Sequence, residues 1–321
     1  MTTLLNALLA CAGDSPPLDT NERGDDLADH RVADDAVGQL SADQSVWSGA
    51  EFTVEPGADV MTCVFGTYTG PTVGLHDVHT LQGAGGHHLQ IMGTTTPLID
   101  VPDGEVMDCT GDGGQFQMAD LEPIGVTNGG SVNGVETGVS MPLPDGMAVQ
   151  LEEGQRYVLQ SHYINTTPEA FKVRDLAVLT TIAEDEVVTW AAPLIYNDSD
   201  FSIPPAGELT TSFECTTEED WNFLYVLGHM HEWGTAFSID RKEGDAFAPF
   251  YDIPEWDPVY RDAPMVDYHP DASLFIPKDT TFRTTCSWFN DKDEALVFPH
   301  EMCVAVNIVY PQKTTVICDA G

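Results

Sequence analysis

The chain has 321 residues, of which 52 are acidic and 12 are basic, so its formal net charge is -40 at pH 7. This charge repels nucleic acid and anionic membrane surfaces, and it excludes both as partners. The length suffices for two domains of common size. The sequence contains no apolar stretch of about 20 residues, so it predicts no membrane-spanning segment.

The N-terminal residues read as part of an export signal. A short apolar stretch ends in Leu8-Leu9-Ala10-Cys11, and a polar segment with prolines follows it. These four residues resemble the lipobox of bacterial lipoproteins, in which the cysteine is lipidated after cleavage. Because no Lys or Arg precedes the stretch, two alternatives stay open: the true start lies upstream, or the match is accidental. We expect a partial lipoprotein-type signal over residues 1–11, with Cys11 as the lipidation candidate.

Residues 12–45 are rich in Asp and poor in aromatic residues. Such a composition buries too little apolar surface to form a core, and it predicts an acidic flexible tether. Beyond it, the chain is rich in short runs that alternate or are β-branched, separated by clusters of Gly, Pro, Asp and Asn. The clearest runs are 157–164, 176–183, 222–228, 235–240 and 303–310. No long helical periodicity appears, and the pattern predicts an all-β fold of antiparallel β-sandwiches.

Six cysteines remain when Cys11 is set aside: Cys63, Cys109, Cys215, Cys286, Cys303 and Cys318. An even number in an exported chain indicates disulfides, although fifteen pairings are open and free buried thiols are the alternative.

Two sets of residues have the composition of metal ligands. The first set is three imidazoles, His87 and His88 in GGHHLQIMG and His162 in VLQSHYIN. Three imidazoles suit copper, zinc or iron about equally. Neighbours in a regular strand point to opposite faces, so His87 and His88 can reach one ion only with a bulge, a strand end or an unusual choice of ring nitrogens.

The second set is His229 and His231 in VLGHMHEWG, with Met302 in FPHEMCVAV. If residues 221–231 form one strand, alternation places both histidines on one face, together with the odd-numbered residues from Trp221 to Leu227. A thioether is a soft ligand that selects the lower oxidation state of copper. Taken singly, a strand histidine or a methionine is more often ordinary packing, and His30, His269 and His300 match no motif.

Taken together, these motifs resemble the ascorbate-dependent copper monooxygenases, the family of dopamine β-monooxygenase and the peptidylglycine α-hydroxylating enzyme. The resemblance covers roughly residues 46–321 and rests on four motifs in family order. They are the pair His87-His88, His162 in S-H-Y, His229-Met230-His231 with Gly234, and Glu301-Met302-Cys303. A family cysteine after the paired histidines is missing here, where Gly93-Thr94 stand.

The resemblance implies two consecutive jelly-roll-like domains with one copper ion each. We place the N-terminal copper domain at 46–185 and the C-terminal copper domain at 186–321. The resemblance also implies the disulfide pairs Cys63–Cys109, Cys215–Cys318 and Cys286–Cys303.

In the mechanism that the resemblance implies, His229, His231 and Met302 form the catalytic site, where dioxygen binds and hydrogen is abstracted from a substrate C–H bond. His87, His88 and His162 hold the copper that stores the second electron, and ascorbate or a similar reductant reloads both ions. The peptide-amidating branch has an arginine two residues before H-x-H, and here that residue is Leu227. Its Asn and Tyr after the E-M-C cysteine are replaced by Val304 and Val306, so the chain resembles the dopamine β-monooxygenase branch more closely.

We therefore expect an exported monooxygenase in the bacterial periplasm, on the outer membrane as a lipoprotein, or outside the cell. Its partners are a small organic substrate, dioxygen and a reductant. A copper-binding or copper-storage lipoprotein without turnover is the alternative, because binding and catalysis use the same six residues. A structural β-sandwich with chance histidines is a third.

Overall fold

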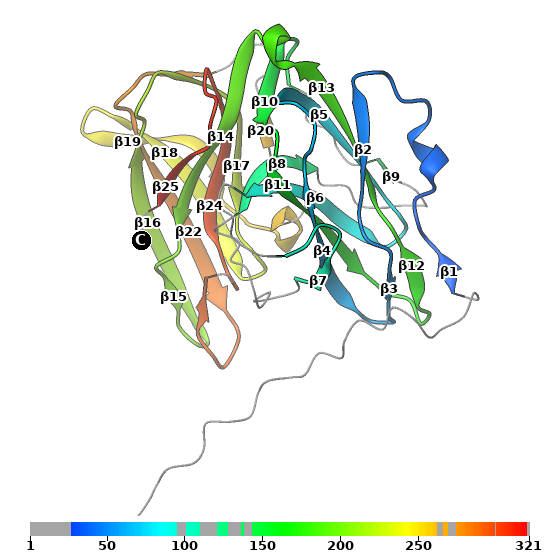
Figure 1. Cartoon of the computed structure of the whole chain (residues 1–321). Helices are drawn as coiled ribbons and strands as arrows, with labels where there is room; N and C mark the ends of the chain where they lie inside the picture. Colours follow the sequence, from blue (N-terminus) through cyan, green and yellow to red (C-terminus); the bar gives the residue numbers. More distant parts are fainter. Residues whose placement is uncertain are drawn as a thin grey trace, which may run out of the picture.

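The computed structural model describes residues 27–94, 101–109, 121–127, 136–137, 143–261, 266–268, 274–298 and 300–319. Cys11, the signal-like segment and the first part of the expected tether lie outside these ranges. Within them the chain is almost entirely β-strand, with short 3-10 turns such as η1 (Asp34–Val37) and no α-helix. The prediction of an all-β fold is confirmed (Figure 1).

The strands of the first half are β1 (Ala28–Asp29), β2 (Gln44–Ser48), β3 (Phe52–Val54), β4 (Asp59–Thr67), β5 (Val73–Gln82), β6 (Gly86–Thr94), β7 (Val106–Asp108), β8 (Leu121–Thr127), β9 (Glu136–Thr137), β10 (Met147–Leu151), β11 (Arg156–Ile164), β12 (Phe171–Val173) and β13 (Leu176–Ala183).

Two antiparallel sheets of the first half pack face to face. One has the order β7-β4-β11-β6-β8, and the other contains β2-β13-β5-β10. The core between them comes from apolar residues of five strands, among them Leu75, Leu89, Leu159 and Leu179. Successive long strands alternate between the two sheets, β4 and β6 in one and β5 and β10 in the other, which is the jelly-roll-like connection that we expected.

The strands of the second half are β14 (Thr189–Asp198), β15 (Ser202–Ile203), β16 (Gly207–Thr216), β17 (Trp221–His229), β18 (Gly234–Glu243), β19 (Ala246–Ile253), β20 (Val266–Tyr268), β21 (Leu274–Ile276), β22 (Thr281–Asn290), β23 (Leu296–Val297), β24 (Cys303–Tyr310) and β25 (Val316–Asp319). The 3-10 turn η4 (Pro258–Arg261) lies between β19 and β20.

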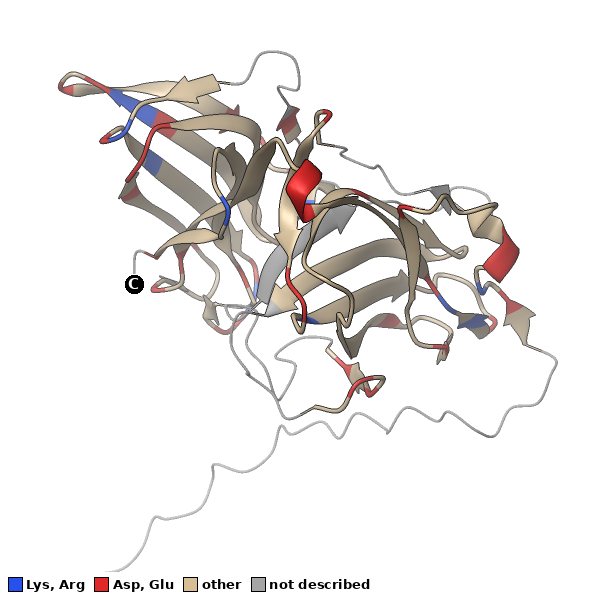
Figure 2. Ribbon diagram, turned by 45° about the horizontal axis from the view of Figure 1, so that its top comes forward, with Lys and Arg blue, Asp and Glu red and all other residues tan. Residues whose placement is uncertain are grey.

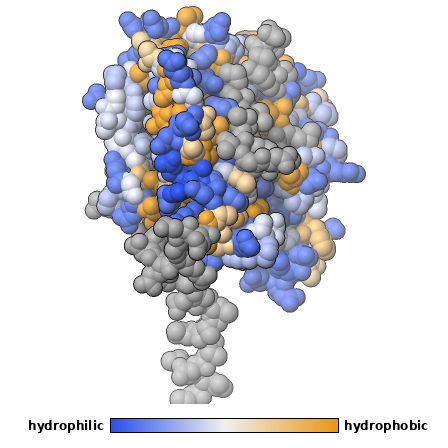
Figure 3. Space-filling view, turned by 90° about the vertical axis from the view of Figure 1, so that its right-hand side faces the viewer, coloured by the Kyte–Doolittle hydropathy of each residue, from blue (hydrophilic) through white to orange (hydrophobic). Residues whose placement is uncertain are grey.

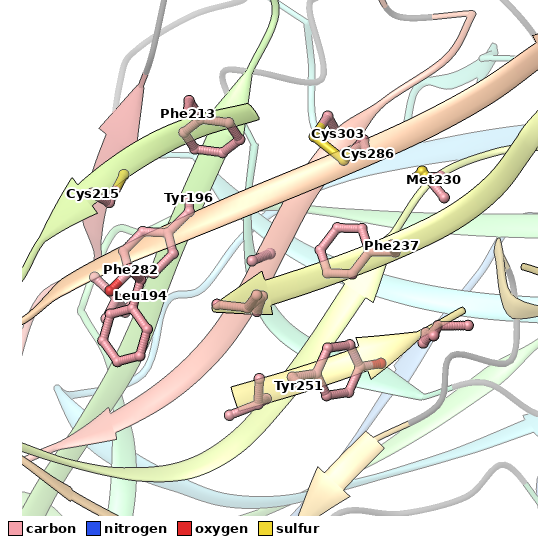
Figure 4. Packing of buried hydrophobic residues seen from close by; sticks show 14 of the residues in the cluster. Leu194, Tyr196, Phe213, Cys215, Met230, Phe237, Tyr251, Phe282, Cys286 and Cys303 are labelled. Carbon is pink, nitrogen blue, oxygen red and sulfur yellow. A yellow bond between two sulfur atoms is a disulfide. The ribbon is translucent and has the colours of Figure 1, made fainter. Parts of the chain in front are cut away.

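The second half is also a sandwich. The sheet β16-β22-β18-β19 faces the sheet part β14-β24-β17-β20. Their core is large and aromatic, and Figure 4 shows Tyr196, Phe213, Phe237 and Phe282 in it. The five runs predicted from sequence coincide with β11, β13, β17, β18 and β24.

A parallel pairing of β10 with β14 joins the two halves. Met147 pairs with Thr189 and Val149 with Ala191, so one sheet of 11 strands runs through both sandwiches. In Figure 1, β14, β24 and β17 stand between the strands of the first half on the right and β16, β22, β18 and β19 on the left. The boundary placed at residue 185 falls in η3 (Glu184–Glu186), directly before β14.

Three disulfides are present, and they are the three pairs that the resemblance implied. Cys63–Cys109 lies in the first half, and Cys215–Cys318 and Cys286–Cys303 lie in the second. The last bridge joins β22 to the first residue of β24, next to Met302, and Figure 4 shows it in the same core as Met230 and Phe237. Disulfides persist where the compartment is oxidising.

The surface is acidic on both halves, and the few basic residues are scattered among many acidic ones (Figure 2). On the face shown in Figure 3, apolar residues are interspersed with hydrophilic ones. Within the described ranges, no helix has the length and apolar content needed to cross a membrane.

Removing each disulfide of the second half in turn tests whether the Cys286–Cys303 bridge positions Met302. Replacing either pair by alanine should lower the free energy of unfolding by about 2–5 kcal/mol, measured by urea denaturation. Only Cys286→Ala with Cys303→Ala should also weaken the copper binding that the sequence predicts for the second set, because Cys303 follows Met302. Cys215→Ala with Cys318→Ala is the matched control, and equal loss of copper affinity in both variants would contradict this role.

Candidate metal centres

The bulge that adjacent histidines require is present in β6. Along β6 and β11 the pairing is regular from Arg156–Thr94 to His162–His88, and then Tyr163 pairs with Gly86. His87 is therefore the extra residue of a β-bulge, which turns its side chain out of strict alternation. As a result His87 and His88 both lie beside His162.

The three imidazoles of the first set converge through their Nδ1 atoms. Nδ1 of His162 lies 3.1 Å from Nδ1 of His87 and 3.4 Å from Nδ1 of His88. The potential ligand atoms of the three residues all lie within 4.8 Å of one another. His88 and His162 are buried and His87 is partly buried, so the cluster opens to solvent on one side only.

Hydrogen bonds at the other ring nitrogens orient two of these imidazoles. Nε2 of His162 donates to the Asp59 carboxylate at 2.6 Å, and Nε2 of His88 contacts Oε1 of Gln160 at 3.4 Å. An imidazole that carries its proton on Nε2 presents a lone pair on Nδ1, which is how the partners of a metal-bound histidine fix its tautomer. The donor set fits a metal ion held by three Nδ1 atoms.

Asp59 was not singled out from the sequence, because a single aspartate at the start of a strand carries no motif. Its hydrogen bond to His162 holds the pKa of this carboxyl below its usual value, against the opposing effect of partial burial. Arg261 of the second half also lowers this pKa, which places a cation from η4 near the first set.

A buried carboxylate is linked through hydrogen bonds to the backbone of the first set. Asp175 accepts hydrogen bonds from the Tyr163 hydroxyl and from Nε2 of Gln82, and the same Gln82 nitrogen donates to the His88 carbonyl at 3.0 Å. Burial raises the pKa of Asp175 to about 6, although Ser161, Tyr163 and Gln82 all act to lower it. The network connects Asp175, just before β13, and the last residue of β5 with the two strands that carry the first set.

The second set lies at the end of β17, and the face assignment made from the sequence is wrong for part of this strand. The register with β24 shifts between Phe223 and Tyr225, so a bulge lies at Leu224. Trp221 and Phe223 pack in the sandwich core, whereas Tyr225 packs in a cluster on the opposite face. His229 therefore shares its face with Tyr225 and Leu227, outside the sandwich core.

The histidines themselves lie together, as predicted. The ring centroids of His229 and His231 are 5.1 Å apart, although β17 ends at His229 and His231 lies beyond it. His229 pairs with Val304 across β24, and the backbone N–H groups of His231 and Met302 both donate to Oε2 of Glu301, which brings the two segments together. Gly228 lets β17 lie directly against the Phe237 ring, since a side chain there would collide with that ring.

Glu301 fixes the two segments of the second set to each other. Its buried carboxylate accepts hydrogen bonds from the backbone N–H groups of His231, Trp233 and Met302, at 3.0, 2.8 and 3.3 Å. The Trp288 indole donates to the same carboxylate at 2.9 Å. Burial raises the pKa of Glu301 to about 7, while these four donors act to lower it.

The ring of His231 has a defined orientation too. Its Nδ1 lies 3.0 Å from the His300 carbonyl, so a proton on Nδ1 leaves Nε2 for a ligand. The Trp256 indole donates to the His231 carbonyl at 3.0 Å, which holds the segment before η4 against this loop. His300 had matched no motif, because its contribution comes from the backbone.

A charged pair lies next to the second set. Arg261 forms an ion pair with Glu232, the residue after His231, and its side chain is only 16% exposed. The same arginine acts on Asp59, which holds His162. Side chains from the second half thus reach the surroundings of the first set.

Comparisons with known proteins do not assign a family. No protein-family model matches the chain, and no curated protein matches its sequence. Among solved structures, the major capsid protein P2 of bacteriophage PM2 is similar at a TM-score of 0.34 and 7% identity, covering 83% of this chain and 97% of that chain. The STIV MCP reaches a TM-score of 0.31 at 9% identity, covering 81% and 96%. Similarity at this level says nothing about function.

The buried carboxylate of Asp175 should make stability depend on pH. Its folded-state pKa of about 6 exceeds the ordinary value of 3.8, so its contribution is fully present below pH 3.8 and is lost as the pH rises through 6. The loss amounts to about 3 kcal/mol. Wild type should lose this amount relative to Asp175→Asn between pH 4 and pH 7 in urea denaturation. Asp185→Asn, on exposed η3, is the control, and parallel curves for wild type and Asp175→Asn would refute the assignment.

Replacing the Glu301 carboxylate by an amide should weaken metal binding at the second set and leave the first set unchanged. In Glu301→Gln an amide NH2 faces backbone N–H donors, and each buried donor left without an acceptor costs about 1–3 kcal/mol. We expect a lower free energy of unfolding and weaker copper binding at His229, His231 and Met302, with the first set unchanged. Calorimetric titration with copper measures both sets, and Glu294→Gln on the exposed surface is the control. A variant that binds both ions as tightly as wild type would show that Glu301 does not hold this loop.

Proposed function

We propose that the protein is a copper-dependent monooxygenase that hydroxylates an activated C–H bond of a small organic substrate. The observation that carries the proposal is the joint presence of a three-imidazole cluster and a separate His-Met-His loop beside a methionine. Hydrogen-bond partners also orient the rings of His88, His162 and His231.

In this proposal the first set holds one copper ion through Nδ1 of His87, His88 and His162. Asp59 accepts a hydrogen bond from the N–H at Nε2 of His162, which keeps the Nδ1 lone pair available. The Asp175 network keeps β6 and β11 in the register on which the bulge depends. This set serves as the electron store.

The second set holds the other copper ion through His229, His231 and Met302, and it is the catalytic site. Glu301 keeps the loop of His231 against Met302, and the His300 carbonyl keeps Nε2 of His231 available. The thioether of Met302 favours the reduced metal.

Bound copper would supply the change of oxidation state and the activation of dioxygen. One oxygen atom enters the substrate as a hydroxyl group, and the other leaves as water. Ascorbate or an equivalent reductant provides the electrons and protons that this balance requires.

The surroundings of His229 favour an apolar or aromatic substrate. Leu227 lies on the same face as His229, two residues earlier, and is buried. A cation at this position would suit a peptide carboxylate, whereas leucine does not, so glycine-extended peptides should be poor substrates. The three disulfides support an oxidising compartment, such as the bacterial periplasm or the cell exterior.

The test combines metal content with turnover. Protein reconstituted with copper should bind two ions per chain, and His162→Ala and Met302→Leu should each perturb one of them. Dioxygen consumption and product formation with ascorbate should be measured over aromatic amines, aromatic acids and glycine-extended peptides. We expect His229→Ala to abolish hydroxylation and dioxygen binding together, and His87→Ala to stop turnover while dioxygen binding persists. His79→Ala, in β5 outside both sets, is the matched control.

The outcomes separate the candidate functions. A single bound copper ion, or zinc preferred at both sets, would contradict the two-copper site. Two bound ions with ascorbate oxidation but no organic product would favour a copper-binding or copper-storage protein. Efficient hydroxylation of glycine-extended peptides would overturn the substrate class.

A further inference from the structure

A methionine lies in the same row of side chains as the first set. Strand β11 lies between β4 and β6, and His162 pairs with Met61 on one side and with His88 on the other. Cross-strand partners of an antiparallel pair point to the same face, with Cβ atoms about 4.5–5.5 Å apart. Met61, His162 and His88 therefore stand side by side on one face of the sheet.

The backbone at Met61 is firmly held. The pairing of β4 with β11 runs without a shift from Thr67–Arg156 to Asp59–Ile164, so alternation fixes the side on which Met61 projects. Its carbonyl accepts the N–H of Cys109 at 2.9 Å, and the Cys63–Cys109 disulfide ties down the same stretch. The side chain is partly buried and is packed against the cluster that contains Cys63, Phe65 and Val158.

We propose that the Met61 thioether is a fourth donor of the first set, which would then bind copper through three imidazoles and one sulfur. The inference rests on the proposed function in one respect, that the first set holds copper. Methionine has three rotatable side-chain bonds and a polarisable sulfur, so it can reach across one strand spacing to an ion beside His162. Met92 lies on the same face as His88, four residues further along β6. It is buried in the apolar cluster and serves as the comparison.

A thioether here would change what the first set does. Three imidazoles alone do not discriminate strongly among copper, zinc and iron, whereas a sulfur donor selects copper in its lower oxidation state. The first set would thus hold its electron more firmly than a purely imidazole set would. Asp59, two residues before Met61 on β4, accepts the hydrogen bond from Nε2–H of His162. The Nδ1 atom of that ring is therefore left for the ion.

The experiment isolates the first set by removing donors of the second. In a His229→Ala, Met302→Leu background loaded with one equivalent of Cu(I), X-ray absorption at the copper edge should detect a sulfur neighbour. Adding Met61→Leu, which conserves volume, should remove that sulfur signal. It should also lower Cu(I) affinity at least about tenfold in competition with a chelator, while Cu(II) affinity changes less. Met92→Leu in the same background should retain both the sulfur signal and the affinity.

Each outcome decides one point. A copper environment of nitrogen and oxygen alone in the background protein, or a sulfur signal that survives Met61→Leu, would overturn the role of Met61 and leave the proposed function intact. Failure of the background protein to bind copper at the first set at all would instead refute the proposed function. Urea denaturation of the Met61→Leu protein shows whether the fold is retained.

Discussion

The arrangement of both histidine sets depends on strand register, and in particular on one extra residue in each of two strands. In β6 the bulge at His87 places the side chains of His87 and His88 on the same side of the sheet, beside His162. In β17 the bulge at Leu224 turns the end of the strand so that His229 leaves the sandwich core and joins the face of Val304. Without these irregularities, alternation would bury one histidine of each set in the hydrophobic core.

Two buried carboxylates, Asp175 and Glu301, hold the strand segments that carry the two sets. Asp175 and Glu301 are both carboxylates without solvent, and each gathers several donors from different strands. Leaving any of those N–H groups without an acceptor would be costly, so the two carboxylates specify which strand segments meet. Asp175 acts through Gln82 on the backbone of His88, and Glu301 acts on the backbone of His231, whereas Asp59 contacts the ring of His162 directly.

The sequence was sufficient for the fold class, the five clearest strands and the membership of both histidine sets. Alternation in runs such as 176–183 and 303–310 reflects one buried face, and such faces survive in the structure as β13 and β24. The requirement for a bulge at His87-His88 followed from strand geometry alone. The bulge at Leu224 did not, because an extra residue in a continuous apolar run leaves the composition unchanged. Asp59, Glu301 and the His300 carbonyl were also missed, since their roles arise from tertiary proximity between distant segments.

The parallel pairing of β10 with β14 joins the two sandwiches by backbone hydrogen bonds within one sheet. Cutting the chain at η3 would leave β10 and residues 189–191 of β14 as edges without a partner strand, whereas residues 194–197 of β14 stay paired with β25. Such edges recruit other chains, so isolated halves would tend to associate through them. The same continuous sheet resists hinge motion, because its ladder would have to break before one half could rotate away from the other. Any substrate of the proposed function must therefore reach its site without the two halves opening apart.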